Sequence, residues 1–236
     1  MSRVIPNLGQ HQILATALAL GLGACAGPRM VPPSDVSKMS KAYEAQDRSR
    51  ASGLFVDESF VIGPYSVADV DRDATSKSNF SIGGYGKSST TTGYTYKLKA
   101  KSGDFSGACG SMAKEQGFSL GDNSSVNWGN VEITCECNGS DGKSEVKLTG
   151  AEKTSTGDMT IDATAYQVSA VNETDSSNFS SQIPGFRVDS GGKPAGAVET
   201  LYPGKIWLDK GAEAGEADHM SCLFVGLMLY VPPSDN

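Results

Sequence analysis

Histidine is scarce in this chain, and its scarcity excludes several kinds of catalysis. The sequence holds 2 histidines, His11 and His219, in 236 residues. A serine nucleophile with a histidine base, or a metal on a His-Glu-x-x-His helix, cannot be assembled from them. No pair of carboxylates stands out for general acid–base chemistry either. We therefore predict a protein that is not an enzyme, and we expect no cofactor.

Excess positive charge and long apolar runs are also missing. The chain carries 20 basic and 27 acidic residues, a formal net charge of −7, and no polybasic cluster. An acidic chain of this kind is a poor partner for nucleic acid, so no nucleic-acid partner is expected. The apolar run near the N-terminus, residues 13–22, is far shorter than the roughly 20 residues that span a bilayer as a helix.

The first 25 residues have the order of an export signal. Arg3 is followed by the apolar run and then by Leu22-Gly23-Ala24-Cys25. This stretch resembles the lipobox of bacterial lipoproteins. The resemblance implies that residues 1–24 are removed and that Cys25 is the lipid-attachment residue, carrying diacylglycerol and an N-terminal acyl chain such as palmitate. The alternatives are an ordinary secretory signal cleaved near Ala24 and a cytoplasmic protein with an apolar first helix.

Export sets the expected location and domain plan. The residue after the cysteine is Ala26 rather than aspartate, which in enteric-type bacteria implies sorting to the outer membrane. We predict a lipid-anchored protein of the bacterial cell envelope, facing the periplasm or the cell surface. Its expected partners are the membrane, through the anchor, and other envelope proteins. We divide the chain into a signal peptide (1–24), a tether with a short helix (25–52) and a single β-rich domain (53–236).

Four further cysteines favour disulfides, because an exported protein folds in an oxidising compartment. Cys135 and Cys137 are two residues apart in a strand-like run and share a face, so they are unsuited to bonding each other. Two pairings remain, 109–135 with 137–222 or 109–137 with 135–222. The rival interpretation is a zinc site made by these two cysteines with His219 and Cys222.

Alternation with period two dominates the middle of the chain. Apolar and polar residues alternate over 94–101, 131–137 and 159–168, which predicts half-buried antiparallel strands. The turn at 138–142 between two such runs predicts a hairpin. Residues 106–116 are compatible with a helix. The polar tracts 76–79 with 87–92, and 173–181, predict surface loops, and so does Gly86-Lys87-Ser88, which resembles only the end of a phosphate-binding loop.

The C-terminal run 219–231 is almost wholly apolar, with Glu213, Glu216 and Asp218 before it. Acidic residues suit a helix N-terminus, and leucine and methionine favour a helix over the alternative of a central strand. A helix that is apolar all round has to be buried on all sides.

These elements predict a mainly β fold: an antiparallel β-barrel or sandwich with one short helix and a buried C-terminal apolar helix. Short strands followed by one apolar helix resemble the tubby and phospholipid-scramblase type of barrel. The resemblance implies that the helix threads the barrel. The lipid-binding residues of that family cannot be placed on this chain.

The most suggestive polar stretch is Asp69-Val-Asp71-Arg-Asp73-Ala-Thr75. It partly matches the aspartate motif of haloacid-dehalogenase-type phosphatases, which requires a parallel α/β fold, and partly the start of an EF-hand loop, whose glycine and closing glutamate are missing. Asp69, Asp71 and Asp73 are therefore weak metal candidates, and the simplest interpretation is a solvated strand end.

The leading functional hypothesis is a lipid-anchored envelope protein that binds or scaffolds without catalysis. One alternative is a barrel that holds a lipid or other apolar ligand. A second alternative is a metal-dependent hydrolase centred on Asp69, Asp71 and Asp73.

Overall fold

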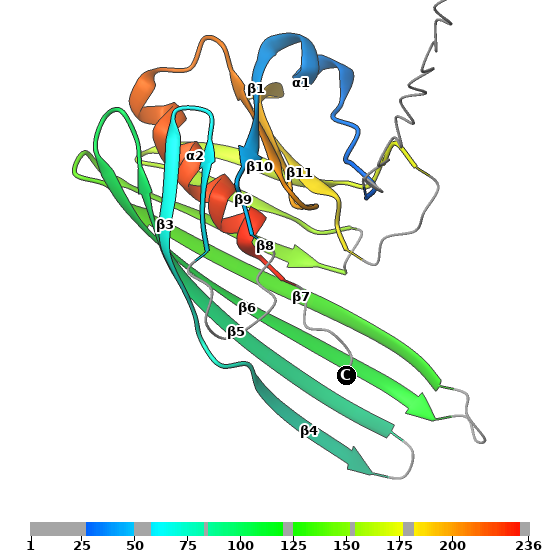
Figure 1. Ribbon diagram of the computed structural model, residues 1–236. Coiled ribbons are helices and arrows are strands. Elements are labelled where there is room, and N and C mark those ends of the chain that lie inside the picture. Colours follow the sequence, from blue (N-terminus) through cyan, green and yellow to red (C-terminus); the bar gives the residue numbers. More distant parts are fainter. Residues whose placement is uncertain are drawn as a thin grey trace, which may run out of the picture.

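A computed structural model describes residues 27–49, 58–82, 85–119, 125–151, 154–176 and 182–231. This part of the chain is a 13-stranded antiparallel sheet with two helices, α1 (Ser34–Met39) and α2 (Ala214–Leu229) (Figure 1). The strands are β1 (Ser40–Gln46), β2 (Glu58–Ile62), β3 (Tyr65–Arg72), β4 (Ser76–Ile82), β5 (Tyr85–Lys99), β6 (Asp104–Ser119), β7 (Ser125–Asn138), β8 (Lys143–Gly150), β9 (Thr156–Ile161), β10 (Thr164–Val171), β11 (Gly185–Ser190), β12 (Lys193–Glu199) and β13 (Lys205–Asp209).

The sheet closes on itself. From β5 to β13 each strand pairs with the next, β13 pairs with β1, and β1 leads through β2 to β3. The ring is completed where β3 pairs with β5, from Ser66 opposite Lys99 to Arg72 opposite Tyr94. The result is a closed 12-stranded antiparallel barrel, with β4 outside the ring. Of the two predicted architectures, the barrel is confirmed.

Apolar and polar residues alternate along the strands, and the apolar ones line the interior of the barrel. In β5 the side chains of Tyr94, Tyr96 and Leu98 are buried, whereas Lys97 and Lys99 face solvent. A strand places successive side chains on opposite faces, so the alternating apolar residues of the barrel strands are directed mainly to one interior. Ala197 of β12 and Trp207 of β13 face the other way and form a smaller cluster with Met30 and Val36. The alternation that predicted strands here is confirmed.

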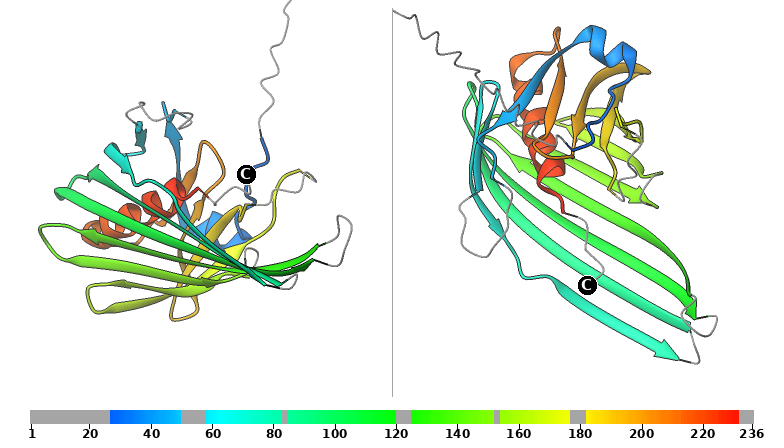
Figure 2. Two further views of the ribbon diagram at one scale, coloured as in Figure 1. Left: turned by 90° about the horizontal axis from the view of Figure 1, so that it is seen from below. Right: turned by 45° about the vertical axis from the view of Figure 1, so that its right-hand side comes forward.

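The interior is occupied by α2. Every residue from Asp218 to Leu229 is buried, and the helix runs through the barrel in each view (Figures 1 and 2). A helix without a polar face needs apolar surroundings on all sides, which the inner face of a closed barrel supplies. The predicted C-terminal helix is confirmed. Among the described residues, no helix is long and apolar enough to cross a membrane.

Two tyrosines of β5 bind the helix backbone. The Tyr94 hydroxyl donates to the carbonyl oxygen of Gly226 at 2.7 Å, and the Tyr96 hydroxyl donates to that of Cys222, also at 2.7 Å. Burial raises the pKa of both phenols, so both remain neutral donors. These bonds satisfy the buried hydroxyls and fix the height of the helix in the barrel.

The N-terminal part of the domain differs from the predicted tether. The short helix is present as α1, but the following residues form β1, a barrel strand that pairs with both β13 and β2. Val36 is fully buried, and Ala45 is nearly so. The tether prediction is therefore wrong for residues 40–46, because Tyr43 and Ala45 face the core from a strand that is paired on both sides.

Two further local predictions are wrong. Residues 106–116 lie in β6, paired along their length with β5 on one side and β7 on the other, so sheet pairing overrides a composition compatible with helix. The polar tracts 76–79 and 87–92, with Gly86-Lys87-Ser88, form the antiparallel pair β4–β5 rather than loops. Of the tract 173–181, residues 177–181 lie outside the described residues.

Strands β5, β6 and β7 are longer than the barrel needs. Their outer ends continue past the C-terminal end of α2 and carry β4 on one edge (Figures 1 and 2). We call this part the projecting sheet: β4 with residues 85–92 of β5, 111–119 of β6 and 125–130 of β7. Eight residues of strand extend about 26 Å.

Gly226 tests how tightly α2 fits. A Cβ at Gly226 would lie 2.7 Å from the Cys109 sulfur and 2.8 Å from the Tyr96 hydroxyl oxygen. We expect Gly226→Ala to lower the free energy of unfolding by about 1–3 kcal/mol through overpacking, despite the higher helix propensity of alanine. The control is Gly110→Ala, where nothing lies within 4 Å of the added Cβ. Urea unfolding that ranks the two variants equally would contradict the tight fit.

Candidate functional site

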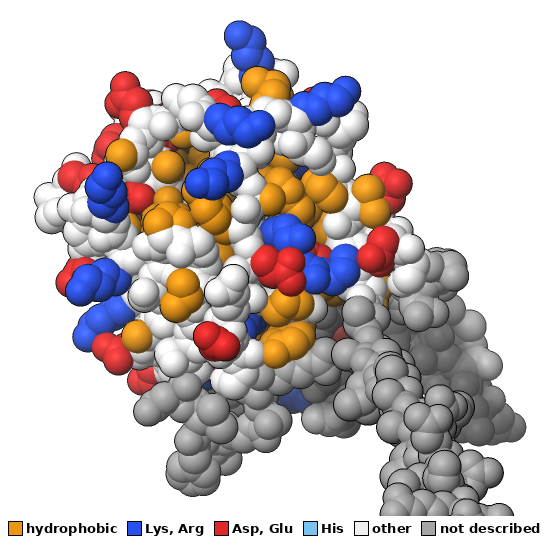
Figure 3. Space-filling model, turned by 45° about the horizontal axis from the view of Figure 1, so that its top comes forward, with side chains coloured by type: hydrophobic (Ala, Val, Ile, Leu, Met, Phe, Trp, Pro, Cys, Tyr) orange, Lys and Arg blue, Asp and Glu red, His pale blue; other side chains and the backbone are white. Residues whose placement is uncertain are grey.

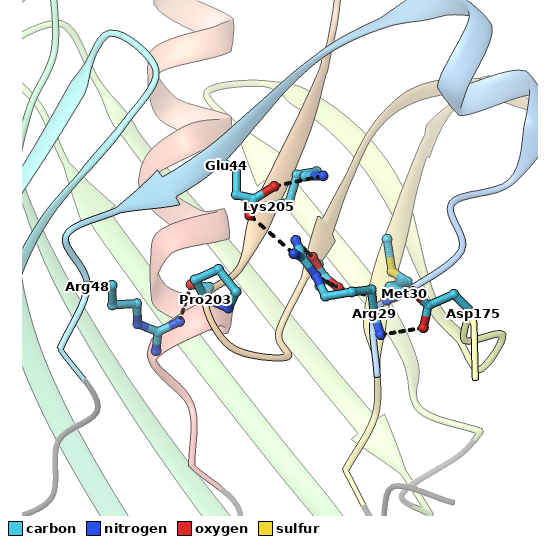
Figure 4. A network of polar contacts seen from close by, with 8 residues as sticks. Arg29, Met30, Glu44, Arg48, Asp175, Pro203 and Lys205 are labelled. Atoms are coloured by element: carbon cyan, nitrogen blue, oxygen red, sulfur yellow. Dashed lines mark hydrogen bonds and ion pairs between the residues drawn. The ribbon is translucent and has the colours of Figure 1, made fainter. Parts of the chain in front are cut away.

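Cys25 itself lies outside the described residues, but the chain just after it is fastened to the barrel (Figure 4). The Arg29 guanidinium forms a two-pronged contact with Glu199, Nε to Oε1 at 2.9 Å and Nη2 to Oε2 at 2.8 Å. The Met30 amide adds a third bond to the same carboxylate at 2.7 Å. The Glu199 side chain is only 1% exposed, so this is a buried charge with a matched partner.

A second set of contacts surrounds this pair. Glu44 accepts from Arg29 at 3.1 Å and from Lys205 at 3.0 Å, and the Arg29 amide donates to Asp175 at 2.9 Å (Figure 4). The hydrogen bond to Glu199 raises the pKa of Arg29, and the bond from Arg29 lowers the pKa of Glu44. Figure 3 shows one face of the molecule with acidic and basic side chains interspersed among apolar ones.

The C-terminal end of α2 is capped by two arginines. Arg48 donates to the carbonyl oxygen of Met228 at 3.0 Å, and Arg72 donates to that of Leu229 at 2.9 Å. Both also bind Glu58, at 3.3 and 2.8 Å, and the Glu58 side chain is 3% exposed. Positive charge at this end satisfies the last carbonyls and complements the helix dipole.

A cavity of about 410 Å³ opens beside these arginines. Its lining comes from the N-terminal segment, the ends of β1 and β3, the β12–β13 turn and the residues after α2, and includes Pro28, Arg48, Arg72, Tyr202 and Val231. The arginines that border it already serve the helix end and Glu58. We therefore interpret the polar groups of this cavity as supports of the helix end and assign no ligand to it.

The four cysteines of the domain form two disulfides, Cys109–Cys135 and Cys137–Cys222. This is the first of the two predicted pairings. Cys109 and Cys135 are direct neighbours on β6 and β7, whereas Cys137–Cys222 joins the barrel wall to α2. The zinc interpretation is wrong, because the sulfur atoms it needs are bonded to one another.

The structure brings together a serine, a histidine and an aspartate that sequence reasoning did not connect. Ser144 Oγ lies 3.1 Å from His219 Nδ1, and Asp141 Oδ1 lies 3.3 Å from His219 Nε2. The ring of Phe105 packs edge-on at 4.9 Å, and His219 is 2% exposed. Only the hairpin turn before β8 could have indicated this contact.

Burial argues against a catalytic role for this trio. The serine is 4% exposed, and its side chain is directed into the barrel. A hollow of about 370 Å³ on the outer face of β7–β9 has Ser144 in its lining, beside the exposed Lys143 and the half-buried Glu145. Strand alternation directs the Ser144 hydroxyl to the opposite face, so we assign the trio to holding the first turns of α2.

The three candidate aspartates do not converge. Asp69 sits at a bulge of β3 with φ of 52°, and its exposed carboxylate pairs with Lys97 at 2.7 Å. Asp71 lies opposite Thr95 on the neighbouring strand, and the Asp73 carboxylate lies over Gly93. Within the described ranges, no group of three histidine, cysteine or carboxylate side chains could hold a metal ion. The stretch marks the point where β3 leaves β5 and β4 replaces it.

The projecting sheet presents large apolar side chains to solvent. Phe80 and Ile82 of β4 are 58% and 68% exposed. By register Phe80 lies opposite Lys87 and Ile82 opposite Tyr85, so the four side chains share one face, and the Lys87 ammonium lies 5.6 Å from the Tyr85 ring centroid. We call Phe80, Ile82, Tyr85 and Lys87 the β4 patch. Clusters of exposed apolar side chains are common at contact sites, so the β4 patch is a candidate contact site.

The class defined by these observations is a closed antiparallel β-barrel filled by its own C-terminal helix. No family model, no curated protein and no solved structure matches the chain.

The buried Arg29–Glu199 pair can be compared with an exposed pair of the same kind. Arg29→Met leaves the Glu199 carboxylate buried without its charged partner, so we expect a loss of about 3 kcal/mol in the free energy of unfolding. Lys97→Met breaks the contact with Asp69, in which the two side chains are 67% and 64% exposed. This variant is expected to leave the urea midpoint unchanged. Equal midpoints for the two variants would show that the N-terminal segment is not fastened.

Proposed function

We propose that this protein is a bacterial lipoprotein, anchored through acyl chains on Cys25, that binds a partner on the outside of its barrel and performs no catalysis. Kinship with the tubby and scramblase type of barrel is part of the proposal and is supported by the threaded helix alone. The cell envelope is the proposed location, with the outer membrane favoured by Ala26.

The filled barrel is the observation that carries the binding role. Barrels that transport an apolar ligand keep a cavity inside. Here α2 occupies that space, with Leu223, Phe224 and Leu227 fully buried against the wall. An apolar ligand inside the barrel would have to displace a helix that a disulfide fastens. Binding is therefore assigned to the exterior.

The anchor is supported by sequence and by the fastened N-terminal segment. Three residues separate Cys25 from Arg29, so acyl chains on Cys25 would start within about 14 Å of a barrel-bound residue. The domain would be held close to the membrane rather than at the end of a long flexible linker. Several acyl chains give stable anchoring without any transmembrane segment.

One experiment tests both parts of the proposal. A photoreactive benzoylphenylalanine replaces Phe80 in one strain and Met39, which is 42% exposed on α1, in a control strain. After irradiation of intact cells, the membrane-extracted protein is analysed by intact mass. We expect loss of residues 1–24, an acyl-sized increment on Cys25, and an added partner mass for the Phe80 position only.

Two results would contradict the proposal. An unmodified Cys25 would remove the anchor. Partner adducts at neither position, or of equal yield at Phe80 and Met39, would remove the β4 patch as the binding surface.

A further inference from the structure

The outer edge of β4 is an open row of backbone groups. On its inner side β4 pairs with β5 through seven consecutive residues, from Ser76 opposite Thr91 to Ile82 opposite Tyr85. On the other side it is the last strand of the sheet that the described residues form. All seven of its residues are exposed. Edge strands invite pairing unless a bulge, a proline or charges prevent it.

Protection of this edge is slight. The pairing with β5 has no bulge, and the strand contains no proline. Its one charged residue is Lys77, at the start of the strand, whereas its second half carries Phe80 and Ile82. Within the ring the barrel strands do not share this exposure, because ring closure pairs both of their sides; residues 125–130 of β7, beyond the ring, are paired with β6 alone.

The two faces of β4 carry side chains of different chemistry. Phe80 and Ile82 face the same way, together with the rest of the β4 patch. Lys77 faces the opposite way, since it is an odd number of residues from both. A strand added beside β4 would thus meet apolar side chains on one face and a positive charge on the other.

The charge of the projecting sheet differs from that of the whole protein. The sheet contains Lys77, Lys87 and Lys114 with one acidic residue, Glu115, whereas the chain carries a net charge of −7. The start of β7, which forms the other edge of the sheet, has no charged residue. Charge complementarity therefore favours an acidic partner, and it favours the β4 edge over the β7 edge because, of these two edges, only that of β4 carries a charged residue, Lys77.

We propose that the β4 edge accepts an extended segment of a second protein as an added antiparallel strand, with two apolar residues two positions apart and an acidic residue three positions after the second. In this register the apolar residues lie beside Ile82 and Phe80, and the acidic residue lies beside Lys77. The inference deepens the proposed function and rests on it. Backbone bonds supply affinity, and the two faces supply specificity.

Two other occupants fit the edge less well. A membrane would leave the backbone groups of β4 without partners, which is costly in lipid. A second copy would offer a β4 strand with no acidic residue to meet Lys77, and a seven-residue pairing is small beside the roughly 1,200 Å² of a stable interface.

The test uses the full-length protein and a labelled peptide, Thr-Val-Thr-Val-Thr-Thr-Glu-Thr, followed by fluorescence anisotropy. Phe80→Ser with Ile82→Ser should weaken binding about tenfold, because apolar contact is lost. Lys77→Glu should weaken binding of this peptide about fivefold. A peptide with lysine in place of glutamate should instead bind the Lys77→Glu variant more tightly than the wild type. Lys99→Glu, an exposed change on the barrel wall, is the matched control and should leave the affinity unchanged.

Peptides with altered patterning separate strand addition from general stickiness. Moving one valine by a single position puts the two apolar side chains on opposite faces, and methylating alternate amides removes backbone donors, so both peptides should bind poorly. Far-UV circular dichroism of each variant confirms that it is folded.

Three results would overturn the inference. Peptide affinity that is the same for wild type and the Phe80/Ile82 variant excludes the β4 edge. Binding to phosphatidylglycerol vesicles that depends on Phe80 and Ile82, without peptide binding, assigns the patch to a lipid surface. Concentration-dependent dimers abolished by the same variant assign it to a second copy. The acylation and cross-linking measurements do not depend on any of these three results. The proposed function can therefore hold even if strand addition at β4 is disproved.

Discussion

The buried helix α2 is the constraint on which the rest of the structure depends. Its own residues cannot stand in water, because the run from Met220 to Leu229 has no polar face. The barrel closes round it and fixes it at several heights: Ser102 binds Asp218 near its start, the Cys137–Cys222 disulfide and two tyrosines hold its middle, and arginines satisfy its last carbonyls. Helix and wall are one core.

Because α2 fills the barrel, the surface open to a partner is the exterior of the barrel. The interior is packed with apolar side chains, and Tyr94, Tyr96 and Arg72 use their polar groups to bind the helix backbone. Features without such a structural use lie where β5, β6 and β7 extend past the end of α2. There the sheet has an open edge, exposed Phe80 and Ile82, and a positive charge on an acidic protein. A closed barrel has no need of a strand such as β4, which makes that strand the best candidate for contact with another molecule.

Prediction from the sequence is correct where a local pattern is strong. The alternation from Tyr94 to Lys101 predicted a strand, the apolar run from His219 predicted a buried helix, and the sharing of a face by Cys135 and Cys137 excluded a bond between them. It failed where tertiary pairing decides, as in β6, whose small residues suit helix or strand until β5 and β7 flank them. It also missed contacts between distant residues, such as Ser144 with His219 and Arg29 with Glu199, because nothing local marks them. The β4 patch stayed hidden because a serine-rich tract looks like a loop until its pairing is known.

Hydrogen exchange followed by mass spectrometry tests the account most directly, since it reports the filled barrel and the open edge in one measurement. The amides of α2 should exchange only by global unfolding, and those of β5 within the barrel should behave likewise. Alternate amides of β4 should exchange many orders of magnitude faster. Fast exchange throughout α2 would contradict a helix enclosed by the barrel, and slow exchange along all of β4 would contradict an unpaired edge.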